Sequence, residues 1–290
     1  MSNSLQTPVW FITGASAGFG HSIALEALSR GHKVIASARS ASSLSSLASA
    51  GAHTVALDVT SPQTSIEPVA SAAVSKYGYI THLVNAAGYM LFGAIEETSP
   101  AEDLAIFSTN VLGTLNVCKA FLPHMRATSA SHHTAIANFG SIGSWYSGAG
   151  YALYSSTKFA VSGLTEGLRD ELAPLGISVT VVEPGYFRTD FLNPSKRVRS
   201  AKVLECYSDT GVGKNLAATL AADGKQPGDV EKGSKIIVDI LCKEGAGEGK
   251  EVPVRIPLGS DAPAAIGGKC TSTLELLGEW EDVITKTDHE

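Results

Sequence analysis

A tyrosine and a lysine stand four residues apart in the segment "GYALYSSTKFAVSGL", residues 150–164. On a helix, residues i and i+4 lie on one face, one turn apart, so Tyr154 and Lys158 can act on the same group. A phenol titrates near about 10 and needs a nearby cation, here Lys158, to favour its phenolate at neutral pH. Tyr151 has Ser155 four residues on and cannot form this arrangement. We therefore predict that Tyr154 transfers a proton and that Tyr151 lines the substrate pocket.

A serine is placed to assist this tyrosine. Ser141 directly follows the apolar, β-branched run 134–140, which predicts a strand. In parallel sheets with helices on both faces, ligands bind beyond the carboxyl ends of the strands. The Ser141 hydroxyl is therefore expected to reach the same substrate oxygen as Tyr154.

The glycine-rich turn "TGASAGFG", residues 13–20, follows the first apolar run. Gly14, Gly18 and Gly20 would allow a tight turn and a close approach of the backbone to a pyrophosphate at the N-terminus of the next helix. No GK[ST] sequence follows, which excludes a nucleotide-triphosphate P-loop. The turn predicts a dinucleotide site, and an ordinary structural turn is the alternative.

The residues after the second apolar run indicate the type of dinucleotide. A carboxylate here would bond both ribose hydroxyls of NAD, but the sequence has Ala38 and then Arg39, whose guanidinium suits a 2′-phosphate. This favours NADP(H); the alternative is an exposed arginine that begins a loop. Asp58 and "NAAG", residues 85–88, follow the next two runs and complete a polar rim for adenosine and ribose.

Apolar runs alternate with helical stretches along the chain, which predicts an α/β fold with a doubly wound, mostly parallel seven-stranded sheet and helices on both faces. The longest helices are expected at 99–127, broken near Asn110, and at 151–174. The seven expected strands are 9–14, 33–38, 53–58, 79–86, 134–140, 177–184 and 250–256.

The C-terminal part departs from this alternation. Residues 186–229 lose strand character and predict a substrate lid. A C-terminal extension, about 260–290, is expected to start as a helix near Ala262 and to end in a charged tail. No change of composition defines a second domain, so 1–290 is predicted to be a single domain.

Composition excludes several classes of protein. The net charge is −6, and the longest basic run is "KRVR" at 196–199, interpreted as a solvated loop, so neither nucleic acid nor a membrane is an expected partner. The N-terminus resembles no signal peptide, and no apolar segment approaches the roughly 20 residues of a membrane span, which favours a soluble, cytoplasmic protein. The four cysteines and eight histidines show no ligand spacing, so no metal is expected.

Taken together, these segments resemble the short-chain dehydrogenase/reductase family, in its single-domain branch. The matching residues occur in the family's order over about 180 residues and are "TGASAGFG", Asp58, "NAAG", Asn110, Ser141, "YSSTK" at 154–158 and "PGYFRT" at 184–189. The resemblance implies a Rossmann-type fold and a homodimer or homotetramer paired through the two long helices.

The resemblance also implies roles for individual residues. Tyr154 would be the general acid toward a carbonyl, Ser141 would polarise its oxygen, and Lys158 would lower the tyrosine pKa and hold the nicotinamide ribose. Asn110 would support a water that links Lys158 to solvent, and Thr189 would hold the carboxamide. The full set of predicted cofactor-binding residues is Gly14, Ser16, Gly18, Phe19, Gly20, Arg39, Asp58, Asn85, Ala86, Gly88, Tyr154, Lys158, Pro184, Gly185 and Thr189.

Aromatic and apolar residues follow the fourth, fifth and sixth expected strands. We predict that they line a pocket for a largely apolar carbonyl compound or secondary alcohol, including cyclic or aromatic ones; the alternative is that they pack the lid against the domain. These residues are Tyr89, Met90, Leu91, Phe92, Trp145, Tyr146, Tyr186, Phe187 and Phe191, with Tyr151 beside them.

The sequence thus predicts an NADP(H)-dependent carbonyl reductase or alcohol dehydrogenase. Three alternatives stay open: a non-catalytic nucleotide-binding regulator of the same fold, an alcohol dehydrogenase that prefers NAD, and an epimerase or dehydratase of nucleotide sugars.

Overall fold

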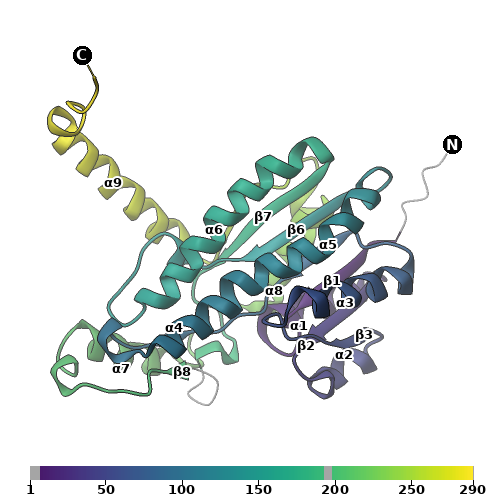
Figure 1. Cartoon of the computed structure of the whole chain (residues 1–290), viewed down its shortest axis with the longest axis horizontal. Coiled ribbons are helices and arrows are strands. Elements are labelled where there is room, and N and C mark those ends of the chain that lie inside the picture. The colour runs from purple at the N-terminus through teal and green to yellow at the C-terminus, as the bar shows by residue number, and fades with distance from the viewer. Residues whose placement is uncertain (1–6, 193–197, 290) are drawn as a thin grey trace.

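The computed structural model of the 290-residue chain describes residues 7–192 and 198–289. At its centre is a parallel sheet of seven strands in the order β3-β2-β1-β4-β6-β7-β9, which confirms the predicted doubly wound fold (Figure 1). The strands are β1 Val9–Thr13, β2 Lys33–Ala38, β3 His53–Ala56, β4 His82–Asn85, β6 Thr134–Phe139, β7 Ile177–Pro184 and β9 Arg255–Leu258.

The last strand begins later than the predicted 250–256. Arg255 is the first β9 residue in register with β7, opposite Val181. The two residues Val252 and Pro253 do not extend the strand. Pro253 has no backbone N–H to donate to a neighbouring strand, and the carbonyl of Val252 accepts a hydrogen bond from the Arg169 side chain at 2.9 Å.

Helices cover both faces of the sheet because successive strand residues point to opposite sides. Trp10 and Ile12 of β1 face the core cluster that includes α1 and α8, whereas Val9 and Phe11 face the cluster that includes α3 and α5. The helices of the domain are α1 Gly18–Ser29, α2 Ser45–Ser49, α3 Gln63–Tyr77, α4 Pro100–Phe107, α5 Gly113–Ser129, α6 Ala152–Leu172 and α8 Val230–Cys242.

The break predicted near Asn110 is a π turn. Residues Ser108–Leu112 form this turn, and the helix continues through them from α4 into α5. Asn110 is buried within the turn. The resulting run Pro100–Ser129 is long and apolar enough to cross a membrane by length and composition. It lies along the sheet, however, and packs Phe121 and Met125 into the core, as a core helix does.

The predicted lid is more ordered than expected. Helix α7, Gly211–Ala222, begins at the Thr210 cap, whose hydroxyl accepts from the Val212 N–H. The strand β8, Val198–Arg199, pairs in parallel with β5, Leu91–Phe92, so these two residues of "KRVR" are not a loop. The other two, 196–197, lie outside the described residues.

The C-terminal helix α9, Ala262–Ile284, starts where the sequence predicts. It contacts β9 and extends away from the domain (Figure 1).

Candidate active site

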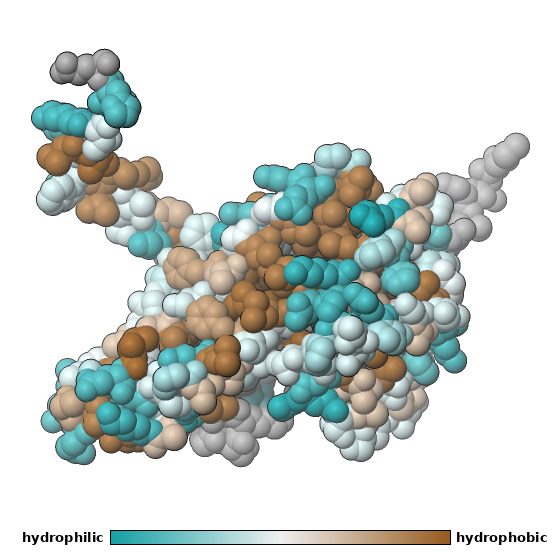
Figure 2. Space-filling model, in the orientation of Figure 1, coloured by the Kyte–Doolittle hydropathy of each residue, from teal (hydrophilic) through white to brown (hydrophobic). Residues whose placement is uncertain are grey.

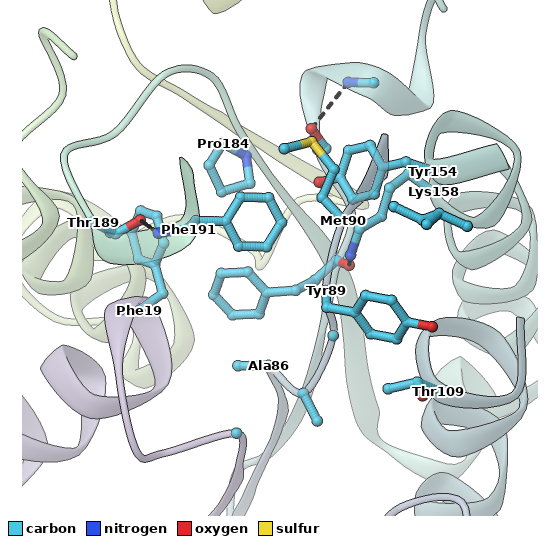
Figure 3. A pocket seen from close by; sticks show the side chains of 18 of the residues that line it. Phe19, Ala86, Tyr89, Met90, Thr109, Tyr154, Lys158, Pro184, Thr189 and Phe191 are labelled. Carbon is cyan, nitrogen blue, oxygen red and sulfur yellow. Dashed lines mark hydrogen bonds between the residues drawn. The ribbon is translucent and has the colours of Figure 1, made fainter. Parts of the chain in front are cut away.

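A cavity of about 1630 Å³ opens at the carboxyl ends of the strands (Figure 3). Ordinary ligand pockets hold about 300–1,000 Å³, so this cavity is large enough for a dinucleotide and a substrate together. Phe19 and Thr189 lie on one side and Tyr154 and Lys158 on the other (Figure 3).

The glycine turn forms one wall of this cavity through close backbone contacts. Gly14 has a φ of +65°, and a Cβ there would lie 2.7 Å from the backbone nitrogen of Ala87. A Cβ on Gly20 would lie 2.6 Å from the carbonyl oxygen of Gly14. Because both side chains are absent, the turn packs against the residues after β4 and leaves the N-terminus of α1 facing the cavity. This arrangement fits a pyrophosphate.

The end of the cavity near β2 and β3 carries Arg39, Ser43 and Asp58. The carboxylate of Asp58 accepts hydrogen bonds from the Thr60 N–H at 2.9 Å and hydroxyl at 2.7 Å, and these bonds hold its pKa below the ordinary value. Arg39 is exposed, so its guanidinium is accessible to a ligand phosphate. The sequence analysis did not predict that Ser43 lines the cavity. Its position in the first turn after β2 could have indicated this.

Tyr154 and Lys158 both reach the cavity, and Ser141 hydrogen-bonds to the Tyr154 hydroxyl. Burial raises the pKa of Tyr154 to about 12, although the Ser141 bond lowers it. Burial also lowers the pKa of Lys158 to about 8. Lys158 Nζ donates to the Phe139 carbonyl at 2.7 Å and lies 5.7 Å from the tyrosine ring centroid. Desolvation is the largest influence on the Tyr154 pKa here, and the predicted lowering by Lys158 stays a prediction.

Asn110 does not line the cavity. Its Nδ2 donates to the Tyr89 carbonyl and to Thr157 Oγ1, both at 3.0 Å, and its Oδ1 accepts from the Tyr89 N–H at 3.0 Å. These bonds join the segment after β4 to α6. The Asn110 side chain thus positions Tyr89 and the helix that carries Lys158, and its predicted support of a water stays a prediction.

Asn85 also points away from the cavity. Its Nδ2 donates to Asn138 Oδ1 at 2.9 Å and contacts Cys118 Sγ at 3.2 Å, inside the core between β4 and α5. The alternation of side chains along β4 places it there. The predicted cofactor role of Asn85 is corrected, whereas Ala86 and Gly88 after it do line the cavity.

Trp145, predicted to line the pocket, lies outside the cavity lining. Its indole N–H donates to Glu183 Oε2 at 2.8 Å, and the Arg255 guanidinium lies 4.5 Å over its ring. Glu183 is buried, pairs with Arg255 and accepts from Ser162 at 2.9 Å. The hydrogen bond to Glu183 and the contact with Arg255 hold the indole outside the cavity lining. Phe92, likewise predicted in the pocket, packs edge-on against Tyr151 at 5.0 Å instead.

The other predicted pocket residues line the cavity, and Phe187 lies at its Phe19 side, where the two ring centroids are 5.0 Å apart. These pocket residues are Tyr89, Met90, Leu91, Tyr146, Tyr151, Tyr186, Phe187 and Phe191. The Phe191 ring lies 6.0 Å from that of Tyr154, centroid to centroid. Few charged groups lie at this end, so the geometry suits an apolar ligand.

Helix α7 adds a wall that the sequence analysis missed. Asn215, Ala218, Thr219 and Ala222 line the cavity, and their i, i+3, i+4, i+7 spacing is the signal that could have indicated one helical face. The Tyr151 hydroxyl hydrogen-bonds to Thr219 Oγ1, and Asn215 Nδ2 donates to the backbone oxygen of residue 149 at 2.9 Å. These two bonds hold α7 over the substrate end.

This site and fold are those of a known family. The model of the short chain dehydrogenase family matches residues 8–199, and the chain belongs to this family of oxidoreductases. Oxidoreductase BOA17 of Botryotinia fuckeliana is 34% identical over 282 residues, which cover 96% of this chain and 98% of that protein.

Solved structures agree with this assignment. A short-chain dehydrogenase from Streptomyces avermitilis superimposes with a TM-score of 0.87 at 37% identity, with 99% of this chain and 100% of that chain covered. A 3-ketoacyl-(acyl-carrier-protein) reductase from Brucella melitensis, complexed with NADH, gives a TM-score of 0.71 at 25% identity and covers 88% of this chain and 98% of its own. ElxO with NADP bound gives 0.68 at 26% identity and covers 87% and 98%.

Proposed function

We propose that this protein is an NADP(H)-dependent carbonyl reductase, or alcohol dehydrogenase in the reverse direction, for largely apolar substrates. The observation that carries the proposal is one cavity with Arg39 at its adenosine end, and Ser141, Tyr154 and Lys158 among aromatic side chains at the other. Structural neighbours bound to NADH and to NADP support a nicotinamide cofactor.

The bound nicotinamide would supply hydride to the carbonyl carbon. Tyr154 donates its phenolic proton to the carbonyl oxygen, and its pKa of about 12 keeps that proton in place at neutral pH. Ser141 positions the same oxygen by a second hydrogen bond. Lys158, with its pKa near 8, is largely charged at neutral pH and donates to the ribose hydroxyls.

Arg39 is expected to set the cofactor preference. A charge-assisted bond between its guanidinium and the 2′-phosphate is worth about 1.5–3 kcal/mol, so Arg39→Ala should weaken NADPH binding about tenfold to a hundredfold. NADH binding should change little, because NADH has no 2′-phosphate. Fluorescence titration with both cofactors measures this. An equal loss for both would show that Arg39 is structural.

The substrate class is tested with a panel of ketones, quinones and secondary alcohols, assayed with NADPH and with NADH at the nicotinamide absorbance band. We expect kcat/KM to rise with the hydrophobicity of the ketone, because Met90, Tyr151 and Phe191 line the reaction end of the cavity. A preference for small charged keto acids would contradict the proposed pocket. Turnover with NADH alone would instead favour an NAD-preferring alcohol dehydrogenase.

The segment 192–228 is expected to close over bound substrate. Two hydrogen bonds, from Tyr151 to Thr219 and from Asn215 to the residue 149 carbonyl, hold α7 to the catalytic side. A ligand in the cavity would add contacts to α7 and slow its local opening. Limited proteolysis of the free protein should therefore begin in this segment and slow when NADPH and a ketone are added. Cleavage that ligands leave unchanged would argue against a lid.

The proposal places the enzyme in the cytoplasm. Its four cysteines, Cys118, Cys206, Cys242 and Cys270, are free thiols, which suits a reducing compartment.

A further inference from the structure

Among the residues that the structure describes, helix α9 contacts the domain at its start. Asp261 accepts a hydrogen bond from the Tyr186 N–H at 2.9 Å, and Ala262 is buried. Every residue from 267 to 289 is exposed. Helices in water gain most of their stability from packing, and Gly267, Gly268 and Gly278 weaken this one further. A helix of 23 residues in this situation requires a surface to pack on.

One face of α9 has the spacing of a helix-pairing seam. Its residues, in steps of four and three, are Ile266, Cys270, the polar Thr273, Leu277, Trp280 and Ile284, and Leu274, Leu276 and Val283 lie beside this series. These steps are the a/d repeat of two packed helices. Leu277 and Trp280 are each 49% exposed and Ile284 is 46% exposed. Hydrophobic side chains gather along this projecting helix (Figure 2).

We propose that α9 pairs in antiparallel orientation with α9 of a second copy of this chain. A register centred on Glu275 is self-complementary. It places Ile266 opposite Ile284, Cys270 opposite Trp280 and Thr273 opposite Leu277 of the other copy, each twice by two-fold symmetry. Leu274 and Leu276 flank the centre of the pair, and each lies level with the other leucine of the second copy. In such a contact both copies use the same surface, so the pairing of α9 stops at two chains.

Charge selects the antiparallel orientation. Four carboxylates, of Glu275, Glu279, Glu281 and Asp282, lie in the second half of α9, whereas the first half carries Lys269. A parallel pair would bring the acidic halves together. An antiparallel pair places the acidic half of each helix beside the less acidic half of the other. It also sets the two helix dipoles in opposite directions, which is favourable.

The same features disfavour other occupants. An acidic helix is repelled by an anionic lipid surface, and α9 points away from its own domain (Figure 1). The pair would bury twelve large apolar side chains, from residues 274, 276, 277, 280, 283 and 284 of both copies. At roughly 80 Å² each this is about 1,000 Å², the lower limit for a specific protein interface.

Light scattering after size-exclusion chromatography tests the pairing. The full chain should have a mass at least twice its 30.1 kDa, and Leu277→Glu should halve that mass, because it places a charge in the seam. Ser272→Glu adds the same charge on the outward face and should leave the mass unchanged. Both sites are exposed, so NADPH binding by each variant verifies folding. A monomeric full chain, or an unchanged mass for Leu277→Glu, would overturn the proposal.

Cross-linking with a short bismaleimide tests the register, in a Cys206→Ser background that removes the other exposed thiol. The antiparallel register separates the two Cys270 residues by ten helical positions, about 15 Å, so they should not cross-link. Adding Trp280→Cys should yield a covalent dimer, and adding Cys270→Ser as well should abolish it. A covalent dimer through Cys270 alone, or one that persists without Cys270, would show a parallel pair and overturn the arrangement.

Discussion

Tyr154→Phe is expected to lower kcat for carbonyl reduction about 10²–10⁴-fold, the range for loss of a positioned general acid. The phenylalanine ring keeps the contact with Phe191, whose centroid lies 6.0 Å away, and removes only the hydroxyl that bonds to Ser141. The affinity for NADPH should therefore stay within about twofold of the wild type. Steady-state kinetics and fluorescence titration measure the two quantities separately.

The matched control is Tyr151→Phe, one turn earlier on the same wall of the cavity. Its hydroxyl bonds to Thr219 of α7 and not to the substrate oxygen, so this variant should keep most of its rate. An inactive Tyr151→Phe beside an active Tyr154→Phe would reverse the assignment of the two tyrosines.

The second large effect is expected at Lys158. Lys158→Met keeps the length of the side chain but loses the charge, so both NADPH affinity and kcat should fall, each by about tenfold or more. Two losses are expected because the ammonium group serves the ribose and also lies beside Tyr154, 5.7 Å from its ring centroid. A fall in kcat alone would show that Lys158 does not hold the ribose.

The pH dependence of binding gives an independent test of this lysine. Burial lowers the pKa of Lys158 to about 8, so the side chain is charged below that pH and neutral above it. NADPH affinity should therefore weaken as the pH rises through 8. Lys158→Met should bind weakly and show no such decline. The same decline in the variant would assign the titration to another group.

The fold and the order of the site residues along the chain could be predicted from local sequence patterns. Apolar runs of strand length alternate with helical stretches, and right-handed crossovers leave few arrangements for such a pattern. Gly14 and Gly20 are local requirements of a turn, and Tyr154 and Lys158 share a helical face through spacing alone. Such features depend on residues close together in sequence, so they could be predicted, as could the start of α9 at Ala262.

The directions of some side chains depend on contacts between distant parts of the chain. So does the pKa of Tyr154, which reflects both nearby polar groups and burial. Asn85 ends β4 and Trp145 follows β6, but hydrogen bonds to Asn138 and Glu183, on other strands, keep both side chains out of the cavity lining. The pKa of Tyr154 rises because the packing around it removes water, a cost that spacing to Lys158 does not reveal. Each of these outcomes depends on groups far apart in the chain, which only the folded arrangement brings within a few ångströms.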